Sequence, residues 1–334
     1  MRRNKISLPT GPWVPLLVVA FLASIAFSLL SASFLTPFNV YVVLSDAALL
    51  SVIGFAQLIV LSVGEFSLAV GGIGGFSAVV AGYLLVAKGV PLAPAVLAGL
   101  VAGMAGGFIN GLLVAKSRVS GFVITLATGG AFTGASLAIT QTSPYTNLPH
   151  ALTVFGTGRI GFVPYLAGAT LAVAVALGVL FRWRKLGRTM LAMGGNAEAA
   201  QLSGLSKARA MVWAHTLSGL LSAAAGVMAM AKLHEANPLV GADWLIQSFT
   251  IPIIGGTSLL GGSVAVWGVI IASLILATIN DGLVLIHVNP YWVTLVEGAL
   301  VFLAVLLGRA QTWDKYREMV AGLIARRTRG LNRT

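Results

Sequence analysis

Residues 188–209 read RTMLAMGGNAEAAQLSGLSKAR, a polar and basic stretch between apolar segments that are long enough to cross a membrane. Asn196 is a favourable helix N-cap, and Glu198 follows in the first turn, where the helix dipole stabilises a carboxylate. Gly204 is the residue type that most often follows the end of a helix. The stretch therefore predicts a short helix of about two turns outside the membrane.

The predicted helix has one smooth face. Ala197, Ala200 and Gly204 recur at helical spacing, and Leu202 and Leu205 add apolar side chains. A short, capped helix of this kind suits insertion into a groove of another protein. An ordinary loop that helps to set membrane topology explains the same residues, so both interpretations stand.

The composition places the whole chain in the membrane. Hydrophobic residues make up 57% and charged residues only 9% of 334 residues, whereas a soluble domain carries about a quarter charged residues. Only helices and closed barrels satisfy their backbone groups in lipid, and the long apolar segments favour helices. We predict an all-α integral membrane protein in which residues 1–334 form a single transmembrane domain.

Ten apolar segments predict about ten transmembrane helices, because about 20 apolar residues cross a bilayer. They are residues 13–35, 40–63, 67–87, 92–115, 121–141, 161–181, 210–231, 245–260, 264–285 and 291–308. Gly99, Gly103, Gly107 and Gly111 lie on one face of the fourth segment and predict a close helix crossing.

The distribution of basic residues predicts cytoplasmic N- and C-termini. If each segment crosses once, all of the 21 lysines and arginines except Lys88, Arg159 and Lys232 lie inside, as the positive-inside rule requires. Residues 182–209 then form a cytoplasmic loop and residues 309–334 a basic cytoplasmic tail. This distribution explains the net charge of +12 through contacts with membrane lipid, without a nucleic acid partner.

Three short matches, in the same order, predict an internal inverted repeat. Gly64-x-x-Ser67-Leu68-x-x-Gly71 recurs at 255–262, Ile109-Asn110-Gly111-Leu112 recurs with one inserted residue at 279–283, and 122–129 recurs at 291–298. The third pair begins on opposite sides of the membrane, as an inverted repeat requires. The first pair falls on the same side, which an inverted repeat does not allow. Inverted repeats place a substrate path at their interface.

Polar residues within the apolar segments are candidates for that path, because such residues face protein or water rather than lipid. Glu65 lies between glycines that allow a helix to break at membrane depth, although a simple helix cap explains it as well. Glu297 falls within the last segment. The candidate path residues are Gln57, Glu65, Ser67, Asn110, Thr125, Asn280, Thr294 and Glu297.

Two stretches carry a resemblance to a known family. The sequence GGNAEAAQLSGLS at 194–206, followed by an apolar segment from near Met211, resembles the cytoplasmic coupling loop of ABC-importer permeases. The resemblance is to the ribose/simple-sugar branch of the family that also holds the branched-chain amino-acid permeases. GEFSLAVGG at 64–72 resembles the family signature, but Glu65 stands in place of the usual Asp and Phe66-Ser67 in place of Leu-Ser. The resemblance covers nearly the whole chain and is weakest before about residue 40.

The resemblance implies a transport subunit of an ATP-binding cassette importer in the bacterial inner membrane. The residues implied to couple it to a separate cytosolic ATPase subunit are Gly195, Asn196, Glu198, Ala199, Ala200 and Gly204. It also implies a periplasmic substrate-binding protein, a homodimer or heterodimer of permeases, and a monosaccharide or related small polar solute.

Two alternatives remain open. The same machine could carry branched-chain amino acids, or the chain could be a self-sufficient secondary transporter with Glu65 and Glu297 as proton carriers. The sequence has no P-loop and no metal-ligand spacing. We therefore expect no catalysis, cofactor or metal in this chain, and ATP hydrolysis on another subunit.

Overall fold

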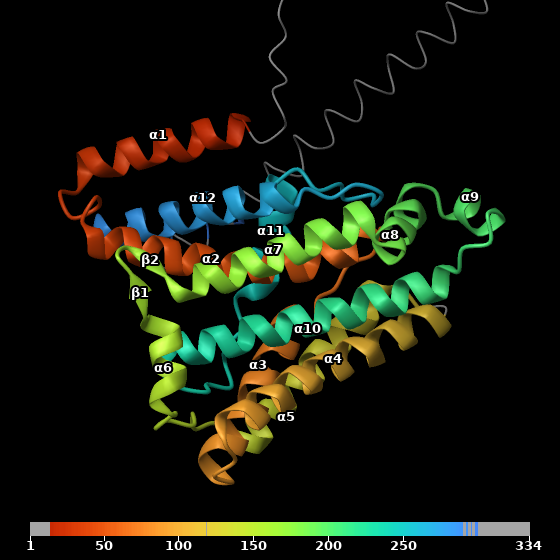
Figure 1. The fold of residues 1–334 in the computed structure, drawn as a ribbon, viewed down its shortest axis with the longest axis horizontal. Helices are drawn as coiled ribbons and strands as arrows, with labels where there is room; N and C mark the ends of the chain where they lie inside the picture. The colour runs from red at the N-terminus through yellow and green to blue at the C-terminus, as the bar shows by residue number, and fades with distance from the viewer. Residues whose placement is uncertain (1–13, 118, 290–291, 293–294, 296–297, 300–334) are drawn as a thin grey trace, which may run out of the picture.

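The computed structural model describes residues 14–117, 119–289, 292, 295, 298 and 299 (Figure 1). Its elements are α1 Val14–Leu30, α2 Pro37–Ser62, α3 Val70–Gly82, the π-helix η1 Tyr83–Ala87, α4 Leu92–Lys116, α5 Gly121–Thr140, α6 His150–Thr157, β1 Arg159–Ile160, β2 Val163–Pro164, α7 Tyr165–Trp183, α8 Lys185–Gly195, α9 Ala197–Leu202, α10 Lys207–Leu233, α11 Trp244–Ile254 and α12 Val266–Leu285. The long helices run side by side, which confirms the predicted helical class.

Seven helices among the described residues are long and apolar enough to cross a membrane. They are α2, α3 with η1, α4, α5, α7, α10 and α12. The first predicted segment corresponds to the 17-residue α1, and the segment 245–260 corresponds to the 11-residue α11 followed by a loop. Most of the segment 291–308 lies outside the described residues. The chain is a multi-pass membrane protein, and the count of ten crossings remains a prediction.

The connections between the long helices gather at two ends of the bundle. At one end, called the α9 end, the turn after α2 contacts the loop between α11 and α12, where Gly262 N donates to Ser62 O at 3.2 Å. At the other, called the α6 end, Tyr145 N donates to Ala236 O at 3.2 Å. Figure 1 shows α8 and α9 at the first end and α6 with the strands at the second. Successive long helices therefore alternate in direction.

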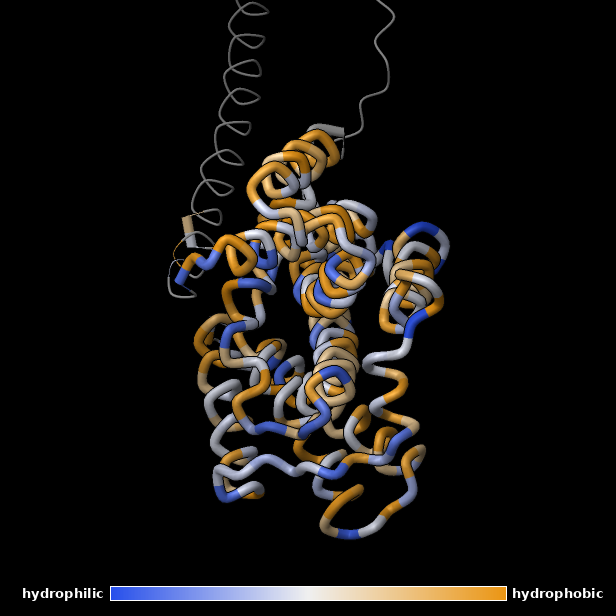
Figure 2. Tube along the Cα trace, turned by 90° about the vertical axis from the view of Figure 1, so that its left-hand side faces the viewer, coloured by the Kyte–Doolittle hydropathy of each residue, from blue (hydrophilic) through white to orange (hydrophobic). Residues whose placement is uncertain are grey.

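α2 and α10 form the centre of the bundle, and α5 lies at its edge. Their most apolar windows are 78% and 72% buried, against 17% in α5. Figure 2 shows hydrophobic residues along the helices and hydrophilic residues mostly in the connections. Exposed apolar side chains on α5, such as Leu126 and Ile139, are therefore suited to lipid or to another membrane subunit.

The predicted glycine stripe on α4 is a packing surface. A Cβ added to Gly99 would lie 2.7 Å from Ser77 O of α3, and one added to Gly111 would lie 2.7 Å from Val212 Cα of α10. Contacts this short leave no room for a side chain, because real Cβ atoms do not approach backbone so closely. The stripe lets α4 approach both neighbours, as predicted.

The inverted repeat remains a prediction. Asn110 on α4 and Asn280 on α12 both lie in the C-terminal third of their helices, and these helices run in opposite directions, as a repeat of this kind requires. The two Gly-Ser motifs, in contrast, lie together at the α9 end, since a Cβ on Gly261 would stand 2.6 Å from Gly64 N. That pair of motifs is a contact between two loops on the same side of the molecule.

Candidate functional site

The predicted short helix is α9, and it lies at the outer edge of the α9 end (Figure 1). Asn196 caps it, since Asn196 Oδ1 accepts a hydrogen bond from Ala199 N at 2.9 Å. The helix ends before Gly204, whose φ of +82° is the left-handed conformation that glycine adopts most easily. The start and end of the helix are therefore where the sequence predicts them.

The two faces of α9 differ in exposure. Ala200 is only 6% exposed and packs into the hydrophobic core, so it seats the helix on its own chain. Leu202 is 86% exposed and projects from the other face, with Glu198 and Ala199 also exposed. The surface that is free for a partner therefore carries Glu198, Ala199 and Leu202, whereas of the smooth face formed by Ala197, Ala200 and Gly204 only Ala200 is buried.

The structure adds α8, a helix within the loop predicted at residues 182–209. Met190 and Met193 are 0% and 4% exposed and anchor this helix to the core. Lys185 and Arg188 lie on its exposed surface. The apolar residues Leu186, Met190 and Met193 recur at helical spacing, and this pattern is the signal that predicts such a helix.

A junction of backbone joins α8 to two other segments. We use the name glycine junction for Ser62, Gly64, Gly194, Gly261 and Gly262. A Cβ on Gly261 would lie 2.8 Å from Gly194 Cα, and a Cβ on Gly262 would lie 2.6 Å from Gly195 Cα. The segment before α9, the end of α2 and the loop before α12 are therefore in backbone contact.

The turn between α2 and α3, residues 63–69, is held by three of the predicted path residues. In the amide orientation that satisfies both partners, Gln57 Nε2 donates to Ser67 O at 2.9 Å and Gln57 Oε1 accepts from Ser67 N at 3.3 Å. Thr125 Oγ1 accepts from Leu68 N at 3.0 Å. Gln57, Ser67 and Thr125 are all buried. They satisfy backbone groups that the helix break frees, as buried irregular backbone requires.

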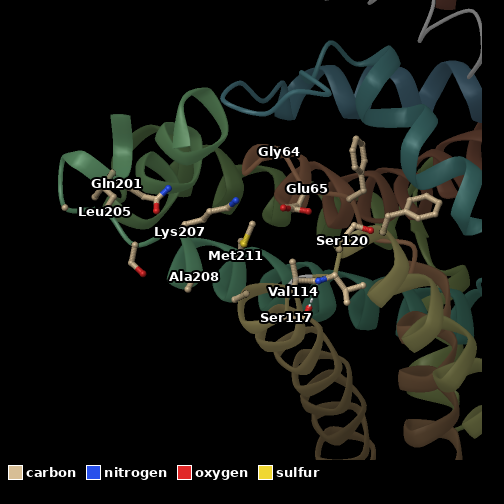
Figure 3. Close-up of a pocket in the computed structure, with 17 residues that line it drawn as sticks. Gly64, Glu65, Val114, Ser117, Ser120, Gln201, Leu205, Lys207, Ala208 and Met211 are labelled. Carbon is tan, nitrogen blue, oxygen red and sulfur yellow. Dashed lines mark hydrogen bonds between the residues drawn. The ribbon is translucent and has the colours of Figure 1, made fainter. Parts of the chain in front are cut away.

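Glu65 lies in this turn and faces a cavity of about 950 Å³ at the α9 end. Figure 3 shows the Glu65 carboxylate and the Lys207 ammonium directed toward each other in this cavity. Its walls come from the α2–α3 turn, the α4–α5 turn and the segment from Gln201 to Met211. The segment that follows α9 therefore forms one wall of the cavity that contains Glu65.

Burial raises the pKa of the Glu65 carboxyl above its ordinary value of 4.5, and the nearby Lys207 ammonium opposes the rise. In the sequence nothing distinguishes Lys207 from the other basic residues near a membrane span. Its position directly after Ser206, the N-cap of α10, fixes it beside Glu65. Such a pairing between segments far apart in the chain has no local signal.

The remaining candidates are dispersed. Asn110 is fully buried on α4, and among the described residues neither its Nδ2 nor its Oδ1 has a partner. Asn280 lies on α12 and lines a second cavity toward the α6 end. Thr294 and Glu297 lie outside the described residues. The structure thus brings Gln57, Glu65, Ser67 and Thr125 together and leaves the two asparagines elsewhere.

Comparison with known proteins gives the family. Residues 37–305 match the family model described as the permease component of the branched-chain amino acid transport system. The chain belongs to this permease family.

The permease is also similar to several curated proteins of sugar import. It is 35% identical over 305 residues to a ribose import permease protein of Bacillus subtilis, with 90% of this chain and 93% of that protein covered. It is 32% identical to a D-allose transport system permease protein of Escherichia coli, covering 87% and 90% of the two chains. A fructose import permease protein of Rhizobium meliloti is 31% identical, with 90% and 86% covered. No solved structure matches the permease.

Proposed function

We propose that this permease is the membrane-spanning subunit of an ATP-binding cassette importer that moves a monosaccharide or related small polar solute across the bacterial inner membrane. The observation that carries the proposal is the match, over about nine-tenths of the chain, to permease proteins of ribose, allose and fructose import. The permease performs no catalysis, and ATP is hydrolysed on a separate subunit.

The α9 end supports a docking role toward that ATPase. α9 is capped, seated by Ala200, and exposes Leu202, which is the kind of apolar anchor that enters a groove on another protein. The basic residues of α8 suit the cytoplasmic side of a membrane. We therefore place the ATPase, the N-terminus and the C-terminal tail in the cytoplasm and a periplasmic binding protein at the α6 end, with two permease copies forming the pore.

The glycine junction supports a route from docking to the solute path. Any displacement of α9 and Gly194 also shifts the loop at Gly262 and the end of α2, because these backbones are in contact. The end of α2 leads directly into the turn with Glu65. Nucleotide binding on the ATPase would in this way move a wall of the inner cavity and change access from the cytoplasm.

A second candidate solute is a branched-chain amino acid, because the description of the matching family names that transport system. The sugar proposal is favoured because the relatives at 31–35% identity named above are sugar permeases. The solute carried by the binding protein that copurifies with the permease decides between the two.

The proposal is tested by purifying the permease from its own host in mild detergent. We expect a P-loop ATPase subunit to copurify, and we expect Leu202→Asp to reduce its recovery at least tenfold, because a charge at the centre of a docked helix loses its hydration. Leu239→Asp is the matched control, since Leu239 is also exposed, at 61%, but lies outside α9. A permease that carries no ATPase and takes up solute under a proton gradient alone would instead be a secondary transporter.

A further inference from the structure

A second cavity of about 800 Å³ lies between α2, α11 and α12, in the half of the bundle toward the α6 end. Its polar lining includes Asp46, Asp243, Gln247, Asn280 and Asp281. No part of the α9 end contributes to it. A cavity of this size in a bundle of apolar helices is large enough for a small polar solute with water.

The polar groups of the cavity combine donors with acceptors. Gln247 and Asn280 are amides, which both donate and accept hydrogen bonds, whereas the three aspartates only accept when ionised. Apolar side chains, among them Leu49 and Ile53, form the rest of the wall. A hydroxyl group donates one hydrogen bond and accepts others, so a molecule with several hydroxyls matches this lining.

The charges of the cavity act against anions. Asp46 pairs with Lys232, and Asp281 Oδ2 accepts from Asn39 Nδ2 at 2.7 Å. Asp243 has no ion-pair partner in the described part of the chain. Three carboxylates against one ammonium leave an excess of negative charge, and a solute carboxylate or phosphate would be repelled inside the bundle.

We propose that the cavity between α2, α11 and α12 is a solute-binding site on the translocation path, and that it accepts neutral, hydroxyl-rich solutes and rejects anionic ones. This inference rests on the proposed function, because it requires that the permease moves a small polar solute. It assigns the first contact of the solute inside the membrane to Asp243, Gln247, Asn280 and Asp281.

The chain contains no cysteine, so a single introduced cysteine reports on the cavity without background. Leu49→Cys places a thiol in the cavity wall, and Leu239→Cys places one on the exposed loop as a control. The assembled importer in membrane vesicles is labelled with methanethiosulfonate reagents of similar size that are cationic, neutral or anionic. The neutral reagent is then repeated with saturating ribose, allose, arabinose and fructose in turn.

We expect the ratio of cationic to anionic labelling rates to be at least tenfold higher at Leu49→Cys than at the exposed control Leu239→Cys, and to fall several-fold when Asp243→Asn and Asp281→Asn are added. We also expect the sugar that the importer takes up to slow neutral labelling at Leu49→Cys and not at Leu239→Cys. Val284→Cys, also in the cavity wall, repeats the test if Leu49→Cys does not assemble.

Two results overturn the inference. In the first, the transported sugar leaves labelling of Leu49→Cys unchanged in vesicles that retain ATP-driven uptake. This result would show that the cavity is not on the solute path, while the proposed function stands. Labelling of Leu49→Cys by the anionic reagent that is as fast as labelling by the cationic one shows that the cavity does not reject anions. Failure of the proposed function itself gives a different result, because the wild-type importer then shows no ATP-driven sugar uptake.

Discussion

Gln57 and Asn110 are both buried amides within membrane-spanning helices, but they differ in what surrounds them. Gln57 gives both of its amide atoms to the backbone of Ser67 and so stabilises the helix break. Asn110 is 0% exposed, and within the described residues its amide has no partner. An unpaired buried polar group costs about 1–3 kcal/mol, so a residue of this kind is kept for a reason other than stability.

We predict opposite effects when each amide is replaced by leucine. Gln57→Leu leaves two buried backbone groups unpaired and lowers the midpoint of thermal unfolding in detergent. Asn110→Leu removes unpaired groups, which increases the free energy of unfolding by about 1–3 kcal/mol at most and raises the thermal midpoint. Solute uptake by this variant falls. An Asn110→Leu variant that is as unstable as Gln57→Leu would show that Asn110 has a partner in the native state.

The raised pKa of Glu65 predicts a specific pH dependence of stability. The native state keeps the Glu65 proton at pH values where the unfolded chain, with a pKa of 4.5, has already released it. Because the native state then binds more protons, stability falls as pH rises from 4.5 through the raised pKa. We expect the thermal midpoint of the wild type to fall more over this window than that of Glu65→Gln. Lys207→Met removes the opposing ammonium and extends the window upward, whereas equal slopes in wild type and Glu65→Gln would contradict the assignment.

At the scale of elements, the glycine junction is where three segments meet by backbone contact alone. The neighbouring residues Gly194 and Gly195 provide a matched pair, since both end α8. A Cβ on Gly194 would collide with Ser62 O and Gly262 N, whereas a Cβ on Gly195 finds nothing closer than Gly262 Cα at 3.8 Å. Both positions are glycines at the end of α8, and they differ in whether a side chain there would meet the backbone of the other two segments.

We predict that Gly194→Ala reduces ATP-driven uptake at least tenfold and that Gly195→Ala leaves it within twofold of wild type. Alanine raises helix propensity by about 1 kcal/mol at either position, so propensity cannot explain a difference. ATPase copurification with both variants shows whether docking persists. Equal uptake by the two variants would remove the junction from the coupling route.

The sequence predicts the elements that depend on local pattern. Asn196 and Gly204 define α9 because caps are local, and the α4 glycine stripe predicts its packing because helical spacing places it on one face. The side of α9 that meets the core has no local signal, because the burial of Ala200 depends on where α8 places the helix. Glu65 and Lys207 line one cavity, and Asp46 and Lys232 form an ion pair, although each pair is more than a hundred positions apart in the chain. No local pattern contains either pairing.

At the scale of the whole molecule, the two cavities lie toward opposite ends of one bundle. Residues of α2 between them, including Phe55 and Leu58, are fully buried. An importer must never be open to both sides of the membrane at once. The packed residues between the two cavities block passage from one to the other in this structure. Transport then requires a displacement that opens one cavity toward the other, and the glycine junction connects that displacement to α9.

The most direct test of this account is solute uptake into proteoliposomes that contain the permease with its copurified ATPase and binding protein. We expect monosaccharide uptake that requires ATP on the α9 side and the binding protein on the α6 side, and that is lost with Leu202→Asp and retained with the apolar replacement Leu202→Met. Uptake by the permease alone, driven by a proton gradient and insensitive to Leu202→Asp, would contradict it.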